Sequence, residues 1–328
     1  MAPAISKPLP AALESTDSLT PLVATTDGRF SLENGGVAAI HTTADRKVEF
    51  VTFETHTLAC VRSAMGYPAY YPVHPVEIRH PIKAVLMDLD GTSVRSEEFW
   101  MWIIEMTTAD LLQDSSFRLC DEDLPFVSGH SVSEHLQYCI AKYAPHATVE
   151  EARKHYFRHT RREMRAILDG NGRAGAFTPS PGLKEFLLEL KSRGIKIGLV
   201  TSGLYEKAWP EIVSAFTTLG MGDPVSFYDA AVTAGTALRK GSAGTMGELC
   251  IKPHPWLYAE TARVGLGIPF EERHHVVGIE DSGAGVVSVR LAGFAPLGIG
   301  GGNIAQSGTR SLCAGYGESF DEILTFIG

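Results

Sequence analysis

The sequence of 328 residues has little of what marks secreted, membrane-spanning or nucleic-acid-binding proteins. Its five cysteines are scattered without CxxC spacing, so we expect reduced thiols of a cytoplasmic protein and no disulfide framework. No apolar run reaches membrane-spanning length, and the first 20 residues lack the apolar stretch of an ordinary signal peptide. The net charge of −9 does not indicate a basic surface of the kind that binds nucleic acid or anionic membranes. We therefore expect neither nucleic acid nor a membrane as a partner; the oligomeric state is left open.

The segment KAVLMDLDGT at 83–92 is the most informative part of the chain. Residues 84–87 form an apolar run of strand length, and an acidic turn follows at once, as in a buried strand of a parallel sheet. Ligands of open parallel sheets bind beyond the carboxyl ends of the strands, where Asp88 and Asp90 would stand. Two close carboxylates repel each other, so we expect a hard cation such as Mg²⁺ beside them, shared with substrate phosphate oxygens.

Three later segments repeat the arrangement of a strand or turn followed by polar side chains: IKIGLVTSG at 195–203, KPHPWLY at 252–258, and HHVVGIEDSGAGVVSVRLAGF at 274–294. Taken alone, TSG after a strand is an ordinary turn, and Glu280-Asp281-Ser282 is an ordinary helix N-cap. Taken together and in this order, the segments indicate a single site, because the carboxyl ends of parallel strands share one edge of a sheet.

In this order, the four segments resemble the four motifs of the haloacid dehalogenase (HAD) superfamily, whose members are mostly phosphatases. The resemblance covers roughly residues 82–328. It implies an α/β fold: a Rossmann-like parallel sheet core with an inserted α-helical cap domain of the C1 type, as in the β-phosphoglucomutase and phosphoglycolate phosphatase-like subgroup. It also implies Mg²⁺-dependent hydrolysis of a small phosphorylated metabolite through an aspartyl-phosphate. The N-terminal region lies outside the resemblance and is predicted to be a β-rich extension.

The resemblance also implies roles for individual residues. Asp88 would be the nucleophile, Asp90 the general acid and base, and Thr201 and Lys252 would complete the catalytic set. The phosphate would be bound by Thr201, Ser202, Lys252 and Gly91. The metal would be bound by Asp88, Asp90 (through its backbone carbonyl), Asp281 and Glu280, with Asp281 favoured as a direct ligand and Glu280 orienting or bound through water. Lys240 is a competing candidate for the cation, because the Gly/Ala/Ser/Thr-rich stretch before Lys252 is longer than the family usually has.

We predict an N-terminal tail and β-rich extension over 1–80, a core over 81–95 and 178–328, and a helical cap over 96–177. Within the extension, residues 1–27 read as a tail, VAAIH and VEFVTFETHTLACV in 36–62 as two strands, and 67–75 as an irregular connector because of its prolines. Apolar spacing predicts helices over 97–112, after Ser131 or Ser133, after Thr148, and within 179–194. Residues 226–233 are predicted as a strand region.

Two alternatives remain open. A C1-capped phosphomutase would carry a His and an Arg where this chain has Trp100 and, nearby, Val132, which counts against mutase activity. A non-catalytic binding or regulatory module would have no chemical need for all four acidic and basic motif residues. Arg95, Trp100 and His130 are the candidate substrate contacts, and the sequence does not identify the phosphorylated substrate.

Overall fold

The structure, a computed structural model, describes residues 13, 15–33, 36–62, 68–123, 132–173, 175–234, 236–237 and 250–328. His130, Ser131 and Lys240 lie outside these residues, so the predictions made for them are not tested. No helix within the described ranges is both long and apolar enough to cross a membrane.

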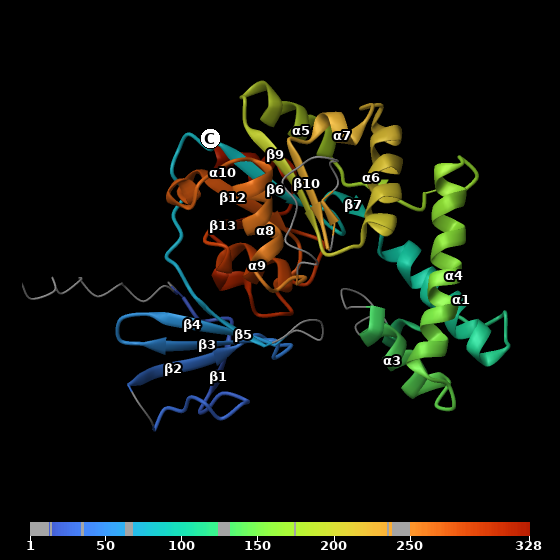
Figure 1. Ribbon diagram of the computed structural model, residues 1–328, viewed down its shortest axis with the longest axis horizontal. Coiled ribbons are helices and arrows are strands. Elements are labelled where there is room, and N and C mark those ends of the chain that lie inside the picture. The colour runs from blue at the N-terminus through green and yellow to red at the C-terminus, as the bar shows by residue number, and fades with distance from the viewer. Residues whose placement is uncertain are drawn as a thin grey trace, which may run out of the picture.

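A seven-stranded sheet forms the centre of the molecule (Figure 1). Its order is β11-β10-β9-β6-β12-β13-β14, and every pair is parallel except β10 with β11. In chain order the strands are β6 Ala84–Asp88, β9 Lys196–Thr201, β10 Ala230–Thr233, β11 Thr236–Ala237, β12 Val276–Glu280, β13 Ala295–Ile299 and β14 Gly315–Gly317. Strand β6 is fully buried between β9 and β12, as its continuous apolar sequence predicts. The predicted α/β fold is confirmed.

Helices cover both faces of this core sheet. Apolar residues of α5, α6 and α10 pack with one face, and those of α8 and α9 pack with the other. The bounds are α5 Leu183–Ser192, α6 Tyr205–Leu219, α7 Pro224–Phe227, α8 Trp256–Glu260, α9 Gly283–Leu291 and α10 Phe320–Ile327. The strand predicted over 226–233 is correct only from Ala230; Asp223 caps a short helix before it by accepting hydrogen bonds from two backbone N–H groups.

A second, antiparallel sheet is built from the first 80 residues and is called here the N-terminal sheet. Its strands lie in the order β1-β2-β3-β4-β5: Thr20–Leu22, Val37–Thr42, Val48–Phe53, Thr57–Val61 and Ala69–Pro72. Three predictions were wrong here. Residues 20–22 are a strand rather than tail, 48–61 are two strands rather than one, and 69–72 are a strand rather than irregular connector.

Two of these errors have a local physical explanation. The turn between β3 and β4 contains no Gly, Pro or Asn, yet it closes with a 2.8 Å hydrogen bond from Phe53 N–H to the His56 carbonyl. The Phe53 and His56 rings stack with centroids 4.6 Å apart. Strand β5 tolerates Pro72 because it lies at the edge of the sheet, where a missing N–H breaks no ladder.

The N-terminal sheet shares a hydrophobic core with α9. Val48, Phe50 and Val61 from the sheet are at most 1% exposed and cluster with Val286 and Val287 of the helix. A hydrogen bond of 2.9 Å from Ala44 N–H to the Ser307 carbonyl adds a backbone tie. The sheet is therefore packed as part of the same folded body as the core.

A helical module lies between β7 Val94–Arg95 and β8 Thr178–Pro179, which pair as a short antiparallel ribbon. It consists of α1 Glu97–Leu112, a 3₁₀ turn at Asp121–Asp123, α3 Val132–Tyr143 and α4 Val149–Leu168. The prediction that Thr148 is the N-cap residue of α4 is confirmed, and Thr148 forms a complete capping box with Glu151. Figure 1 shows the module standing to one side of the core, beyond the ends of the core strands. Lys47 of the N-terminal sheet reaches α3, with Nζ 3.1 Å from Glu134 Oε1.

Candidate active site

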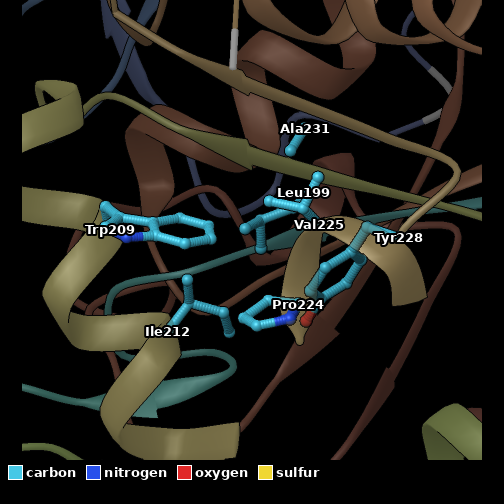
Figure 2. A pocket seen from close by; sticks show the side chains of 7 residues that line it. All are labelled: Leu199, Trp209, Ile212, Pro224, Val225, Tyr228 and Ala231. Carbon is cyan, nitrogen blue, oxygen red and sulfur yellow. The ribbon is translucent and has the colours of Figure 1, made fainter. Parts of the chain in front are cut away.

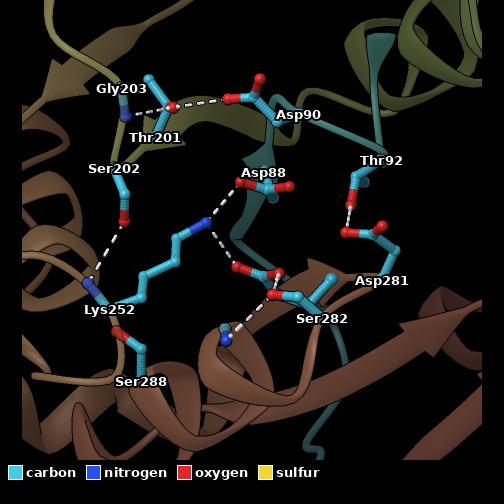
Figure 3. Close-up of polar contacts among 12 residues, drawn as sticks. Asp88, Asp90, Thr92, Thr201, Ser202, Gly203, Lys252, Asp281, Ser282 and Ser288 are labelled. Carbon is cyan, nitrogen blue, oxygen red and sulfur yellow. Dashed lines mark hydrogen bonds and ion pairs between the residues drawn. The ribbon is translucent and has the colours of Figure 1, made fainter. Parts of the chain in front are cut away.

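The predicted motif residues meet at one edge of the core sheet because their strands are neighbours. Asp88 ends β6, Thr201 ends β9 and Glu280 ends β12, and β6 lies between the other two. Parallel strands direct their carboxyl ends to the same edge, so residues far apart in the chain become adjacent there. Lys252 reaches this edge from the loop before α8 (Figure 3).

Lys252 bridges two buried carboxylates. Its ammonium group contacts Asp88 Oδ1 and lies 2.6 Å from Glu280 Oε1, while its own side chain is only 7% exposed. Glu280 is also engaged by the Tyr258 hydroxyl and, at 3.1 Å, by the Ser282 hydroxyl. Burial would lower the pKa of Lys252, but Asp88 and Glu280 raise it above its usual range. The lysine is therefore charged at neutral pH and held beside the candidate nucleophile.

Asp281 lies on the other side of Asp88 from Lys252 in Figure 3 and accepts a hydrogen bond of 3.2 Å from Thr92. Gly91, the residue before Thr92, has φ +82° and packs against the Asp281 carboxylate, leaving no room for a Cβ atom. The Gly91 N–H donates to the Val94 carbonyl at 2.8 Å, so the described geometry explains the glycine by turn shape and close approach. Its binding of phosphate stays a prediction.

The three acids Asp88, Glu280 and Asp281 offer ligand oxygens that all lie within 4.8 Å of one another. Burial, reinforced by Glu280, raises the pKa of Asp88 to about 8, and burial together with Asp88 raises that of Asp281 well above its usual range. Three buried carboxyl groups are thus crowded together, with the Lys252 ammonium group beside two of them. A donor set made only of carboxylate oxygens suits a hard divalent cation, so these residues fit the expected metal.

Asp90 lies apart from this acidic cluster. Its carboxylate is 3.1 Å from Lys207 Nζ and accepts hydrogen bonds from Ser96 at 3.0 Å and Thr201 at 3.3 Å. Burial would raise the pKa of Asp90, but Lys207 and Ser96 hold it below its usual range. The site therefore keeps two separate carboxylates, one beside Lys252 and one beside Lys207.

Lys207, itself half-buried, belongs to a group of side chains that joins α6 to the helical module. Its ammonium lies 4.2 Å from the centroid of the Trp100 ring, and the Trp100 indole donates to Glu211 Oε1 at 3.1 Å. Glu211 is fully buried, and that burial, with Asp90 nearby, raises its pKa well above the usual range. The predicted substrate contact Trp100 is thus 8% exposed and forms part of this junction.

The remaining predicted residues are placed differently. Ser202 Oγ accepts a hydrogen bond of 3.2 Å from the Lys252 backbone N–H, which links the second and third motifs. Arg95 is exposed at the end of β7. Sequence reasoning missed Lys207 and Glu211, although their i, i+4 spacing on the helix that follows TSG places both on one face.

A small hollow shown in Figure 2 lies among α6, α7 and strands β9 and β10. It is lined by Leu199, Trp209, Ile212, Pro224, Val225, Tyr228 and Ala231. The lining is apolar apart from polar atoms of Trp209 and Tyr228, and it includes none of the acidic or basic motif residues. We interpret it as a packing gap of the core rather than as a catalytic pocket.

Comparison with known proteins agrees with this geometry. The family model for haloacid dehalogenase-like hydrolases matches residues 82–293. The chain belongs to this family. The HAD model thus spans the acidic cluster, Lys252 and the helical module, and the prediction of a HAD-like enzyme is confirmed. No curated protein matched the chain.

Solved structures of the same fold cover three quarters of this chain. A predicted phosphoglycolate phosphatase from Haemophilus somnus 129pt is 18% identical, with TM-score 0.56 over 76% of this chain and 99% of that one. A variant of CbbY from Rhodobacter sphaeroides in complex with xylulose-(1,5)bisphosphate is 19% identical. Its TM-score is 0.54, and the match covers 75% of this chain and 99% of that one. A β-phosphoglucomutase candidate from Thermotoga maritima is 18% identical. Its TM-score is 0.52, and the match covers 75% of this chain and 100% of that one. At these identities the likeness establishes the HAD fold.

Proposed function

We propose that this HAD-family hydrolase is a Mg²⁺-dependent phosphomonoesterase that acts on a small phosphorylated metabolite through an aspartyl-phosphate. The observation that carries the proposal is the buried pairing of Lys252 with Asp88, while a second carboxylate, Asp90, lies separately within the same site. A nucleophile, a general acid and base, and a cation for the phosphoryl oxygens are the parts that phosphoryl transfer requires. The named neighbours, a predicted phosphoglycolate phosphatase and a protein in complex with xylulose-(1,5)bisphosphate, support a small phosphorylated substrate.

The chemistry divides into two displacements at phosphorus. In the first, a carboxylate oxygen of Asp88 forms a bond to phosphorus, the ester P–O bond breaks, and Asp90 protonates the leaving alcohol. In the second, water attacks phosphorus while Asp90 takes its proton, and the bond to Asp88 breaks to release inorganic phosphate. Lys252 and Thr201 would bind the phosphoryl oxygens, aided by the backbone N–H of Ser202. Mg²⁺, held by Asp88 and Asp281 with Glu280 oriented beside them, would neutralise negative charge at the phosphoryl group.

The proposal extends to organisation and location. Residues 81–95 and 178–328 would form the catalytic core, 96–177 a helical cap that excludes water and selects the substrate, and 1–80 the β-rich extension. The protein would work in the cytoplasm. Arg95, Trp100 and His130 stay candidate determinants of the substrate.

Phosphate release with Mg²⁺ from a panel of sugar phosphates, phosphoglycolate and nucleotides tests the proposal. Release from a few chemically related compounds is the expected result and would name the substrate class. If none of the panel is hydrolysed but a hexose 1-phosphate is converted to its 6-phosphate, the protein is a phosphomutase. If neither reaction occurs, the non-catalytic binding or regulatory module becomes the better interpretation.

We predict that Lys207→Met lowers kcat about tenfold with an alkyl phosphate and changes KM little, because Asp90 loses the contact that orients it, and this loss outweighs the accompanying rise in the pKa of Asp90. With p-nitrophenyl phosphate, whose leaving group needs no protonation, formation of the aspartyl-phosphate should be affected much less. Rapid-quench measurement of the two substrates separates these steps. Lys191→Met is the matched control, since Lys191 pairs with Asp229 at the amino ends of the core strands. Equal losses for both substrates would contradict the assigned role.

A further inference from the structure

The N-terminal sheet reaches the Lys252 loop through one tyrosine. Tyr71 lies in edge strand β5, and its hydroxyl is 2.8 Å from Nδ1 of His254, two residues after Lys252. The Tyr71 ring also packs edge-on against the rings of His254 and Trp256, with centroids 5.8 and 6.0 Å away. The family model begins at residue 82, so this contact comes from outside the HAD domain.

His254 is held between the N-terminal sheet and α9. The residue is 1% exposed, and its backbone carbonyl accepts a 2.6 Å hydrogen bond from the Ser288 hydroxyl. Burial lowers the pKa of His254, which keeps the ring neutral, and Nδ1 shares a hydrogen bond with the Tyr71 hydroxyl. Among the described residues Nε2 has no hydrogen-bond partner, so the contact with Tyr71 is what orients the ring by hydrogen bonding.

The backbone at His254 also sets the direction of Lys252. The His254 N–H donates to the Ile251 carbonyl at 3.1 Å, which closes a tight turn around Lys252. From that turn the lysine side chain has to reach both Asp88 and Glu280. The backbone conformation sets the direction in which a long, flexible side chain leaves the chain. Small displacements of a group at a reacting centre lower the reaction rate by large factors. A group that fixes His254 therefore fixes Lys252.

We infer that the N-terminal sheet is part of the active site, and that Tyr71 is a positioning residue that holds the Lys252 loop through His254. The inference rests on the proposed function for the role of Lys252, whereas the contact itself does not depend on that function. If the sheet serves only to cover α9, Tyr71 contributes to stability and to nothing else.

Two adjacent tyrosines allow a matched test. Tyr70, the neighbour of Tyr71 in β5, donates its hydroxyl to Asp27 at 2.6 Å within the N-terminal sheet. Tyr70→Phe and Tyr71→Phe each remove one hydroxyl from the same strand. We expect Tyr71→Phe to lower kcat about threefold to tenfold with little change in KM, the usual worth of one hydrogen bond, and Tyr70→Phe to leave kcat unchanged. Thermal unfolding of both variants reports the purely structural effect.

A second pair of variants tests the path through His254. The side-chain amide of Asn lies near the position of Nδ1, so His254→Asn should keep the hydrogen bond to Tyr71 and most of kcat. His254→Ala should lose at least as much as Tyr71→Phe, and combining the two should add no further loss. Additive losses in the double variant would show that Tyr71 does not act through His254.

A measurement without substrate separates this inference from the proposed function. Lys252 is 7% exposed, so its acetylation by acetic anhydride, followed by peptide mass spectrometry, reports how firmly the loop is held. Tyr71→Phe should raise that rate several-fold, and Tyr70→Phe should not. Equal labelling and equal kcat in both variants would overturn the inference. A wild-type protein that releases no phosphate would refute the proposed function, while the labelling would still decide the role of Tyr71.

Discussion

Asp88→Asn is expected to lose phosphate release by roughly 10⁴-fold or more while the protein stays folded. The amide cannot form the bond to phosphorus, and no other carboxylate of the acidic cluster takes the same place at the end of β6. The fold should tolerate the change because Lys252 keeps Glu280 as its partner. Removing one of three crowded carboxylates should also make the metal-free protein at least as stable as the wild type.

Steady-state phosphate release together with thermal unfolding in the absence of divalent metal measures both effects. Asp229→Asn is a suitable control, because Asp229 accepts from the Ile197 N–H at the opposite edge of the sheet and should leave turnover unchanged. Trapping the phosphoenzyme with acid and locating the phosphate by mass spectrometry adds a positive readout in the wild type. Substantial turnover by Asp88→Asn would exclude the aspartyl-phosphate mechanism.

Removal of divalent metal is expected to abolish turnover and to lower thermal stability. Without a cation, the buried carboxyl groups of Asp88, Glu280 and Asp281 crowd together, and Lys252 pairs with the first two. The repulsion among the three acids acts against the folded state. Mg²⁺ at 100 times its dissociation constant should restore activity and add about 2.7 kcal/mol of stability. Asp281→Asn should lose most of this stabilisation, because it removes a predicted direct ligand.

Thermal unfolding after chelation, with and without added Mg²⁺, measures the effect independently of turnover. The Mg²⁺-dependent shift should be present in the wild type and in Asp229→Asn, and should be small in Asp281→Asn. Full turnover after exhaustive chelation would contradict a metal-dependent site. A normal Mg²⁺-dependent shift in Asp281→Asn would instead assign the metal to other ligands.

The core of the site could be predicted because it follows from strand order. Each of Asp88, Thr201 and Glu280 ends an apolar run, and parallel strands bring such ends to one edge without any knowledge of side-chain contacts. Lys252 lies on a loop, and its placement came from the resemblance to the HAD superfamily rather than from a pattern in the residues.

The parts that escaped prediction depend on contacts between distant segments. The surroundings of Asp90 include Lys207, whose relation to Trp100 requires α6 and α1 to lie side by side. Likewise, nothing near Tyr71 in the sequence indicates its contact with His254, which is 183 residues away. Periodicity describes each element alone, so it carries no information on which elements pack together.

The core shared by the N-terminal sheet and α9 has a consequence for synthesis of the chain. Val61 leaves the ribosome 225 residues before Val286, its partner in that core. At ordinary elongation rates, synthesis of these 225 residues takes about 10 to 45 seconds, during which the apolar face of the N-terminal sheet stays uncovered. For the same reason, a fragment that begins at residue 82 would expose Val286, Val287 and Leu291 to water. The HAD domain of this protein is therefore expected to aggregate when it is expressed alone, and the nascent chain to depend on chaperones.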